Sequence, residues 1–142
     1  MKKIFFLIAA VLLLSCDKDN DNNNNNPYLP NYPVNVQLNK SLPEYDNLNY
    51  VANPVYVNIA GVGIRGLIVM KTGEGSYAAF DRACPNQNLS SCSTMTINGI
   101  NAKCPCDDKE YSLFTGLPTT QAQYPMKQYR AQLNGNYVIV TN

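Results

Sequence analysis

The sequence predicts an all-β domain of short antiparallel strands. Apolar and polar residues alternate over short runs, as in strands with one buried face. Turn-forming residues, including 9 prolines and 8 glycines, separate these runs at close intervals. No stretch of the domain has the apolar stripe of an amphipathic helix. Short strands with regularly spaced turns are typical of a small sandwich or barrel.

Four predicted strands precede the first cysteine of the domain. They lie at residues 34–38, 54–59, 66–70 and 77–81. In the first strand, Val34, Val36 and Leu38 point to one face and polar residues alternate with them, which indicates a half-buried strand. The turn-forming residues 71–76 join the third strand to the fourth as a hairpin. Residues 42–48 have room for one helical turn.

Further strands are predicted toward the C-terminus. They lie at residues 95–97, 100–103, 111–114, 128–133 and 137–140. Two of the connections carry strong hairpin signals. The first is Asn98-Gly99, which is a hairpin signal because both residue types tolerate positive φ. The second is the three-residue turn 134–136, which closes the last hairpin.

The N-terminal segment indicates export. Lys2 and Lys3 precede an apolar run over residues 4–14, which is too short for a membrane-spanning helix and has the length of a signal-peptide core. Residues 13–16 (LLSC) resemble the lipoprotein box of bacterial lipoproteins. The resemblance implies that residues 1–15 are a signal peptide and that Cys16 is lipidated, which would hold the protein at a membrane. The alternative is an ordinary signal peptide followed by an unrelated cysteine.

Residues 16–26 form the predicted tether. After Cys16 they contain only Asp, Lys and Asn, so they cannot bury apolar surface and we expect them to be disordered. Acidic residues directly behind a lipidated cysteine resemble the surface-export signals of Bacteroidota lipoproteins. We therefore expect an outer-membrane lipoprotein, and the choice between the cell surface and the periplasmic face stays open. Residues 27–142 have the length of one domain.

Composition excludes several classes of function. The net charge of +1 and the lack of Lys and Arg clusters argue against binding to nucleic acid. The chain has no histidine, which excludes Ser/His/Asp and Cys/His catalysis. Asp107 and Asp108 are adjacent, so an extended backbone points them apart, and we read them as a solvated loop. Gly61, Gly63 and Gly66 are spaced as in a phosphate loop, but no helix follows them. We predict no enzyme active site.

The cysteines of the domain are its most informative feature. They lie in residues 83–86 (ACPN), at Cys92 and in residues 103–107 (KCPCD). Behind them come Tyr111, Phe114, Gly116 and Pro118. From about residue 66 onward, this order of strands, loops and motifs is similar to a Rieske iron–sulfur domain. Residues 34–50 and 80–85 also look like those of Rieske-like lipoproteins of Bacteroidota.

The resemblance assigns the cluster-ligand positions. Each loop of a Rieske domain supplies one thiolate and one imidazole. The thiolate positions fall on Cys84 and Cys104, and the imidazole positions fall on Asn86 and Asp107. A neutral amide and a hard carboxylate do not replace imidazole on an iron–sulfide unit. The resemblance therefore implies a Rieske-like fold that has lost its [2Fe–2S] cluster. Asp108 stands where the family usually has glycine.

The resemblance also bears on cysteine pairing. Respiratory Rieske proteins join a second cysteine of each loop in a disulfide. Cys106 matches one of these positions, and Cys92 is the candidate partner, although it lies further from Cys84 than the family pattern has it. We favour Cys84–Cys104 together with Cys92–Cys106, since thiols that share a metal lie close enough for oxidation. Four cysteines allow three pairings. The alternative is a zinc or iron–sulfur site on all four cysteines.

These features predict a membrane-anchored exported lipoprotein with a degenerate Rieske-like domain. We expect a non-catalytic binding or structural module without a cofactor. The alternative is an electron-transfer or redox protein that uses a four-cysteine metal or iron–sulfur site. The membrane, reached through Cys16, is the predicted partner. The 10 tyrosines suit a glycan-binding surface or the cover of a thin core, and a protein or glycan partner stays open.

Overall fold

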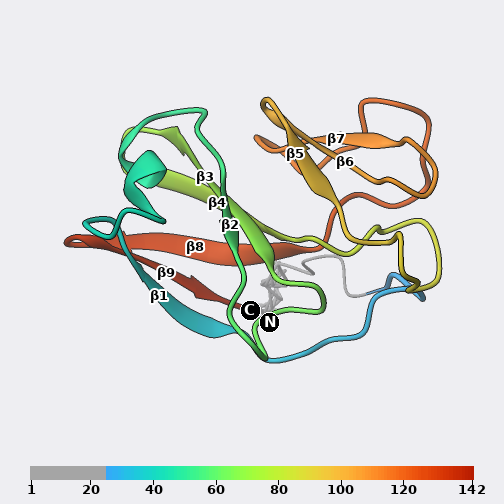
Figure 1. The fold of residues 1–142 in the computed structure, drawn as a ribbon, viewed down its shortest axis with the longest axis horizontal. Coiled ribbons are helices and arrows are strands. Elements are labelled where there is room, and N and C mark those ends of the chain that lie inside the picture. The colour runs from blue at the N-terminus through green and yellow to red at the C-terminus, as the bar shows by residue number, and fades with distance from the viewer. Residues whose placement is uncertain (1–24) are drawn as a thin grey trace, which may run out of the picture.

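The computed structural model describes residues 25–142, which form two antiparallel β-sheets (Figure 1). The signal peptide of residues 1–15, Cys16 and the tether up to residue 24 lie outside the described residues. Asn26 was predicted to end the tether, but its side chain is buried and donates a 2.7 Å hydrogen bond to the Pro85 carbonyl. Composition could not separate Asn26 from the identical asparagines before it. Within residues 25–142, no helix has the length and apolar character needed to cross a membrane.

The larger sheet has six strands in the order β1-β9-β8-β4-β3-β2. They are β1 (Asn35–Asn39), β2 (Val55–Val57), β3 (Leu67–Gly73), β4 (Ser76–Asp81), β8 (Gln128–Asn134) and β9 (Tyr137–Thr141). The smaller sheet consists of β5 (Thr96–Asn98), β6 (Asn101–Lys103) and β7 (Glu110–Ser112), in that order. A short 3-10 helix, η1 (Asp46–Asn49), lies between β1 and β2. The all-β prediction is confirmed.

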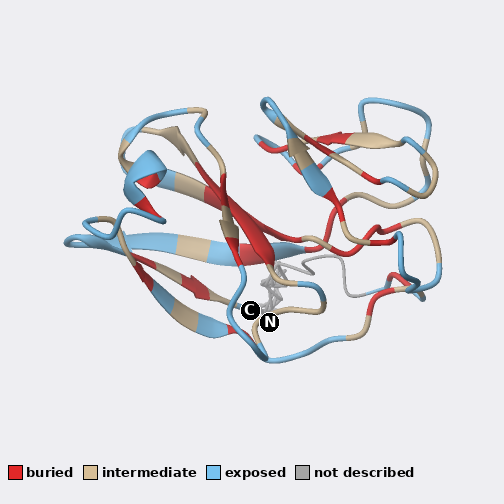
Figure 2. Cartoon of the chain, viewed as in Figure 1, coloured by how far each residue is buried: buried red, intermediate tan, exposed pale blue. Residues whose placement is uncertain are grey.

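Strands β3 and β4 have both faces covered over Leu67–Met70 and Ala78–Asp81, where successive residues are buried (Figure 2). Because side chains alternate along a strand, Leu67 and Val69 join the core of the larger sheet, while Ile68 and Met70 face the smaller sheet. The core between the two sheets also holds Phe80, Cys84, Met95, Cys104, Tyr111 and Leu113. Two of the four domain cysteines are therefore core residues.

The hairpin between β5 and β6 turns one residue later than predicted. Asn98 pairs with Asn101, and the turn lies at Gly99 and Ile100. Only Gly99 has positive φ there, at +62°. Both asparagine amides donate to the carboxylate of Glu110, over 3.0 and 3.2 Å. These bonds to β7 keep Asn98 in the strand, and an Asn-Gly signal cannot reveal them.

Other boundaries differ from the predictions by a few residues. Asn134 pairs with Tyr137, so the last hairpin has a two-residue turn. Strand β3 runs to Gly73, which leaves a shorter connection than the predicted turn 71–76. The helical turn begins at Asp46, later than the start of the predicted segment 42–48, and it buries Leu48. The alternation of the first strand is confirmed, because Val34 and Leu38 are buried and Val36 is partly buried, whereas Asn35 and Gln37 are exposed.

Candidate functional site: the cysteine loops

Three connections come together beside the smaller sheet (Figure 1). We call residues 82–95, between β4 and β5, loop one. Residues 104–109, between β6 and β7, are loop two, and residues 113–127, between β7 and β8, are the third loop. Two disulfides, Cys84–Cys104 and Cys92–Cys106, join loop one to loop two. These are the pairs that the family resemblance favoured.

The two disulfides have different surroundings. Cys84 and Cys104 are 1% and 0% exposed and belong to the core between the sheets. Cys92 is exposed and Cys106 is half-buried. All four cysteines of the described chain are bonded in pairs, so this structure does not form the four-thiolate site that the sequence left open.

Asn86, which the resemblance assigns to the first imidazole position, uses all of its side-chain hydrogen bonds internally. Its Nδ2 donates to the Tyr111 hydroxyl and to the Tyr124 carbonyl, each over 2.8 Å. Its Oδ1 accepts from the backbone N–H groups of Gln123 and Tyr124, over 3.0 and 2.8 Å. An amide offers two donor hydrogens and one acceptor oxygen with two lone pairs, so its capacity is filled. Asn86 therefore fastens loop one to the third loop.

Asp107, which the resemblance assigns to the second imidazole position, shapes loop two. Its Oδ1 accepts from the backbone N–H of Lys109 over 3.1 Å, and its Oδ2 pairs with Lys109 Nζ over 3.0 Å. The next residue, Asp108, has a φ of 58°, which suits the position where the family usually has glycine. The Asp108 backbone N–H donates to the Cys104 carbonyl over 3.0 Å. The Asp107 carboxylate thus serves the loop itself, whereas the Asp108 carboxylate pairs with Lys103 Nζ of β6 over 3.0 Å.

Tyr111 lies fully buried under the cysteine loops. The pKa of its hydroxyl is raised to about 12, mainly by burial; the hydrogen bond from Asn86 opposes the rise and the negative charge of Asp107 adds to it. The hydroxyl is therefore protonated at neutral pH. Near Tyr111, the side-chain amide of Gln87 donates to Cys104 Sγ over 2.9 Å. The Cys104 sulfur and the Tyr111 hydroxyl are thus both bonded to side-chain amides of loop one.

A second buried polar centre, which the sequence did not reveal, lies at the end of β4. The Asp81 carboxylate is 0% exposed and accepts four hydrogen bonds. Its Oδ1 accepts from the backbone N–H groups of Ala83 and Arg65, over 2.8 and 3.2 Å. Its Oδ2 accepts from the Ile64 N–H over 2.6 Å and from the Tyr129 hydroxyl over 2.9 Å. The segment around Gly61, Gly63 and Gly66 therefore donates backbone hydrogen bonds to a carboxylate, as a phosphate loop does to a phosphate. Here the acceptor is the Asp81 side chain of the same domain.

The surroundings of Asp81 explain one glycine of that segment. A Cβ on Gly63, where φ is +70°, would lie 2.7 Å from Asp81 Oδ2. Burial raises the pKa of Tyr129, and the charge of Asp81 adds to the rise. Burial lowers the pKa of Lys127, and Asp81 opposes that change. A carboxylate that ends an apolar strand, with glycines nearby, is the signal that could have indicated this centre.

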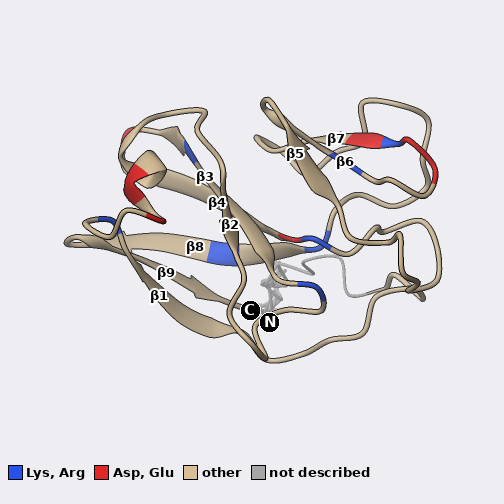
Figure 3. Ribbon diagram, in the orientation of Figure 1, with Lys and Arg blue, Asp and Glu red and all other residues tan. Residues whose placement is uncertain are grey.

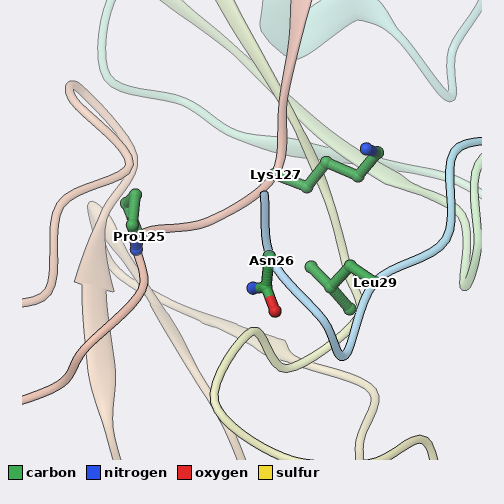
Figure 4. A pocket seen from close by; sticks show the side chains of 4 residues that line it. All are labelled: Asn26, Leu29, Pro125 and Lys127. Atoms are coloured by element: carbon green, nitrogen blue, oxygen red, sulfur yellow. The ribbon is translucent and has the colours of Figure 1, made fainter. Parts of the chain in front are cut away.

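A small depression next to loop one offers no clear ligand site. It is lined by Asn26, Leu29, Pro125 and Lys127 (Figure 4). The Lys127 ammonium group points away from Asn26 and donates to the Asn31 side chain. Four consecutive charged residues, Asp107 to Glu110, lie in loop two and at the start of β7, and the other charged residues are spread over the described elements (Figure 3).

A scan of protein-family models and a search of curated proteins find no match to this chain. Solved structures do match it. The plasma membrane Rieske protein PetC3 from the cyanobacterium Synechocystis PCC 6803 is 20% identical, with a TM-score of 0.50, over 63% of this chain and 86% of that one. A chain in the complex of reduced oxygenase and oxidized ferredoxin in carbazole 1,9a-dioxygenase is 18% identical, with a TM-score of 0.51, over 76% and 93%. The chain has a Rieske-like fold.

The residues at the Rieske ligand positions do not fit an iron–sulfur cluster. A Rieske centre needs two thiolates and two imidazoles. Here the sulfurs of Cys84 and Cys104 are bonded to each other, and the chain has no histidine to supply an imidazole. The hydrogen-bonding capacity of Asn86 is filled by protein groups, and Asp107 pairs with Lys109. The fold is retained with a different set of bonds at its loop tips.

Proposed function

We propose that the protein is a membrane-anchored exported lipoprotein whose Rieske-like domain works as a non-catalytic binding or structural module. The Cys84–Cys104 bond carries this proposal, because it joins the two positions that the resemblance assigns to cluster thiolates. A buried disulfide of this kind holds the two loops together and transfers no electrons through iron. The domain then presents a rigid set of loops to a partner.

The membrane anchor is the part of the proposal that rests on the sequence alone. The lipoprotein-box resemblance at residues 13–16 and the polar residues behind Cys16 support it. Acyl chains on Cys16 bury methylene groups in the bilayer, each contributing about 0.8 kcal/mol. The acidic residues that follow support display from the outer membrane. This arrangement places the domain where disulfides persist.

Metal analysis of freshly purified protein tests the loss of the cluster. The full chain is expressed in a bacterium that makes both iron–sulfur proteins and lipoproteins, and it is purified without oxygen. Iron, zinc and acid-labile sulfide are then measured, and electron paramagnetic resonance spectra are recorded after reduction. We expect substoichiometric metal and no cluster signal. Two irons and two sulfides per chain would refute the proposal, and one zinc per chain would favour the four-cysteine alternative.

Fractionation of cells tests the anchor separately. The unmodified chain should sediment with membranes and incorporate labelled fatty acid. The Cys16→Ser variant should lose the label and be found in the soluble or uncleaved precursor fraction. The Cys92→Ser variant, which changes a cysteine of the domain, should keep the label. Labelling that survives Cys16→Ser would overturn the assignment of the anchor.

A further inference from the structure

The two disulfides of this domain differ in ways that bear on their reactivity. Cys84–Cys104 is enclosed by the core between the sheets. Cys92 ends a run of exposed residues, 88–92, in loop one. Thiol–disulfide exchange requires a thiolate to reach a sulfur atom of the bond, so access separates a reactive disulfide from an inert one. Only Cys92–Cys106 offers a sulfur on an exposed segment.

The exposed disulfide also has a hydrogen-bond donor placed between its sulfurs. Ser90 Oγ lies 3.5 Å from Cys92 Sγ and 3.6 Å from Cys106 Sγ. Disulfide sulfurs carry no proton, so the serine hydroxyl is the donor. The same hydroxyl can donate to a thiolate when the bond opens, and a hydrogen bond to a charged group is stronger than one to a neutral group.

Basic side chains bind residues next to the exposed disulfide. The Arg65 guanidinium donates to the carbonyl of Ser90 over 3.1 Å, and Ser90 is the residue whose hydroxyl contacts both sulfurs. Asp107 follows Cys106 in the chain, but Lys109 Nζ lies 3.0 Å from its carboxylate and offsets its charge. Reactive cysteines are typically found in such partly exposed surroundings with a nearby cation.

The two loops have other bonds that hold them when this disulfide opens. In loop one, the Cys84 N–H donates to the Ser93 carbonyl over 2.9 Å. In loop two, the Cys104 N–H donates to the Lys109 carbonyl over 2.9 Å. Cys84–Cys104 still joins the loops covalently. Reduction of the exposed pair therefore leaves the fold in place.

We propose that Cys92–Cys106 is a thiol–disulfide exchange site for dithiol proteins, and that Cys84–Cys104 is the inert bond that maintains the loops during exchange. A partner thiolate attacks Cys92 Sγ, the Cys92–Cys106 bond breaks, and Cys106 leaves as a thiolate that accepts a hydrogen bond from Ser90. The second thiol of the partner, as a thiolate, then attacks the partner's sulfur in the mixed disulfide. This step forms the disulfide of the partner and releases Cys92 as a thiolate. The dithiol loses two electrons to form its disulfide, and the two cysteines gain them. This activity adds to the proposed function and does not depend on it.

Reduction of the native chain tests this assignment. Protein with its disulfides intact is mixed with reduced thioredoxin, quenched with acid and alkylated, and the labelled cysteines are located by peptide mass. We expect Cys92 and Cys106 to be labelled at least about a hundredfold faster than Cys84 and Cys104, because the buried pair reacts only after local opening. Equal rates, or faster reduction of the buried pair, would overturn the proposal.

Trapping identifies the attacked sulfur. A thioredoxin variant that lacks its second active-site cysteine should accumulate as a mixed disulfide on Cys92. Trapping on Cys106, or no trapping, would contradict the proposed order of bond breaking. The Cys92→Ser, Cys106→Ser double variant should show no exchange and keep the circular dichroism spectrum of the unmodified protein. Loss of the fold in this variant would also contradict the proposal.

A matched pair of serine variants tests the role of Ser90. Ser90→Ala should lower the rate of reduction by about three- to tenfold, the effect of one modest hydrogen bond on the leaving thiolate. Ser91→Ala changes the adjacent exposed serine, whose hydroxyl makes no hydrogen bond to either disulfide in the described structure, and should leave the rate unchanged. Equal rates for the two variants would remove Ser90 from the site.

Discussion

The side-chain amide of Asn86 donates a hydrogen bond to the hydroxyl of Tyr111 over 2.8 Å. Asn86 stands at a position where the family resemblance places an imidazole, and Tyr111 lies below it in the core. The same amide also binds the backbone of the third loop. Asn86 thus links loop one to β7 and to the third loop.

Asn86→Ala should destabilise the domain by about 2–4 kcal/mol, because it removes four hydrogen bonds, one of them to the buried Tyr111 hydroxyl. Urea unfolding, followed by circular dichroism, measures this change. Asn88→Ala is the matched control, since Asn88 is an exposed asparagine of the same loop and its substitution should change stability by no more than about 0.5 kcal/mol. Similar stabilities for the two variants would show that Asn86 is not a link.

The hydrogen-bonded surroundings of Asp81 predict that alanine is tolerated differently at two nearby glycines. Gly61 and Gly63 both have positive φ, but a Cβ on Gly61 meets no atom within 4 Å, whereas on Gly63 it meets the Asp81 carboxylate. Gly61→Ala should cost about 1–2 kcal/mol of stability from backbone strain alone. Gly63→Ala should cost clearly more, since it displaces the hydrogen bonds to Asp81. Equal midpoints of urea unfolding for the two variants would contradict this account.

Alkaline pH should weaken the fold through Tyr111. The folded protein holds the Tyr111 proton up to about pH 12, whereas an unfolded chain releases it near pH 10. Between these values the folded state binds more protons, so stability falls as pH rises, by up to about 1.4 kcal/mol per pH unit for this group. Urea unfolding at several pH values between 9 and 11 measures the slope.

The Tyr111→Phe variant separates this contribution from that of Tyr129, whose raised pKa acts in the same direction. Phenylalanine has no proton to release, so the slope of stability against pH above 10 should become shallower. The variant should also be less stable at pH 7, because it removes the partner of Asn86. An unchanged slope would show that Tyr111 does not carry the pH dependence.

The two disulfides should contribute unequally to stability. Closing loops of 20 and 14 residues stabilises the chain by about 3 kcal/mol for each bond in the chain-entropy model. The Cys84→Ser, Cys104→Ser variant should lose about 1–3 kcal/mol more free energy of unfolding than the Cys92→Ser, Cys106→Ser variant, because it leaves hydroxyl groups in an apolar core. Urea unfolding of the two double variants gives the comparison. Equal losses, or a larger loss for the exposed pair, would contradict the burial argument.

The sequence predicted most strands because burial on one face imposes a two-residue period. Val36 and Leu38 illustrate this, since polar and apolar residues alternate around them. Turn positions were less predictable. Asn98 stays in a strand because Glu110, twelve residues away, accepts a hydrogen bond from its amide. A local turn signal contains no information about such a contact.

The candidate site was predictable only in part. Cysteine motifs and the absent histidine indicated a Rieske-like scaffold with altered ligand positions. The bonds of Asn86 were not predictable, because Tyr124 comes from a distant loop. The role of Asp81 was also missed, since its donors come from three separate segments. Where each side chain finds its partners depends on the folded chain and not on local pattern.

The central claim is that Cys84 and Cys104 are bonded to each other and do not bind iron. Intact mass spectrometry of the protein, isolated without oxygen and alkylated at once under denaturing conditions, tests it most directly. We expect no alkyl groups on Cys84 or Cys104 before treatment with reductant, and a mass about 4 Da below that of the fully reduced chain, since each disulfide lacks two hydrogens. Immediate alkylation of both cysteines, together with two irons released per chain, would contradict the account.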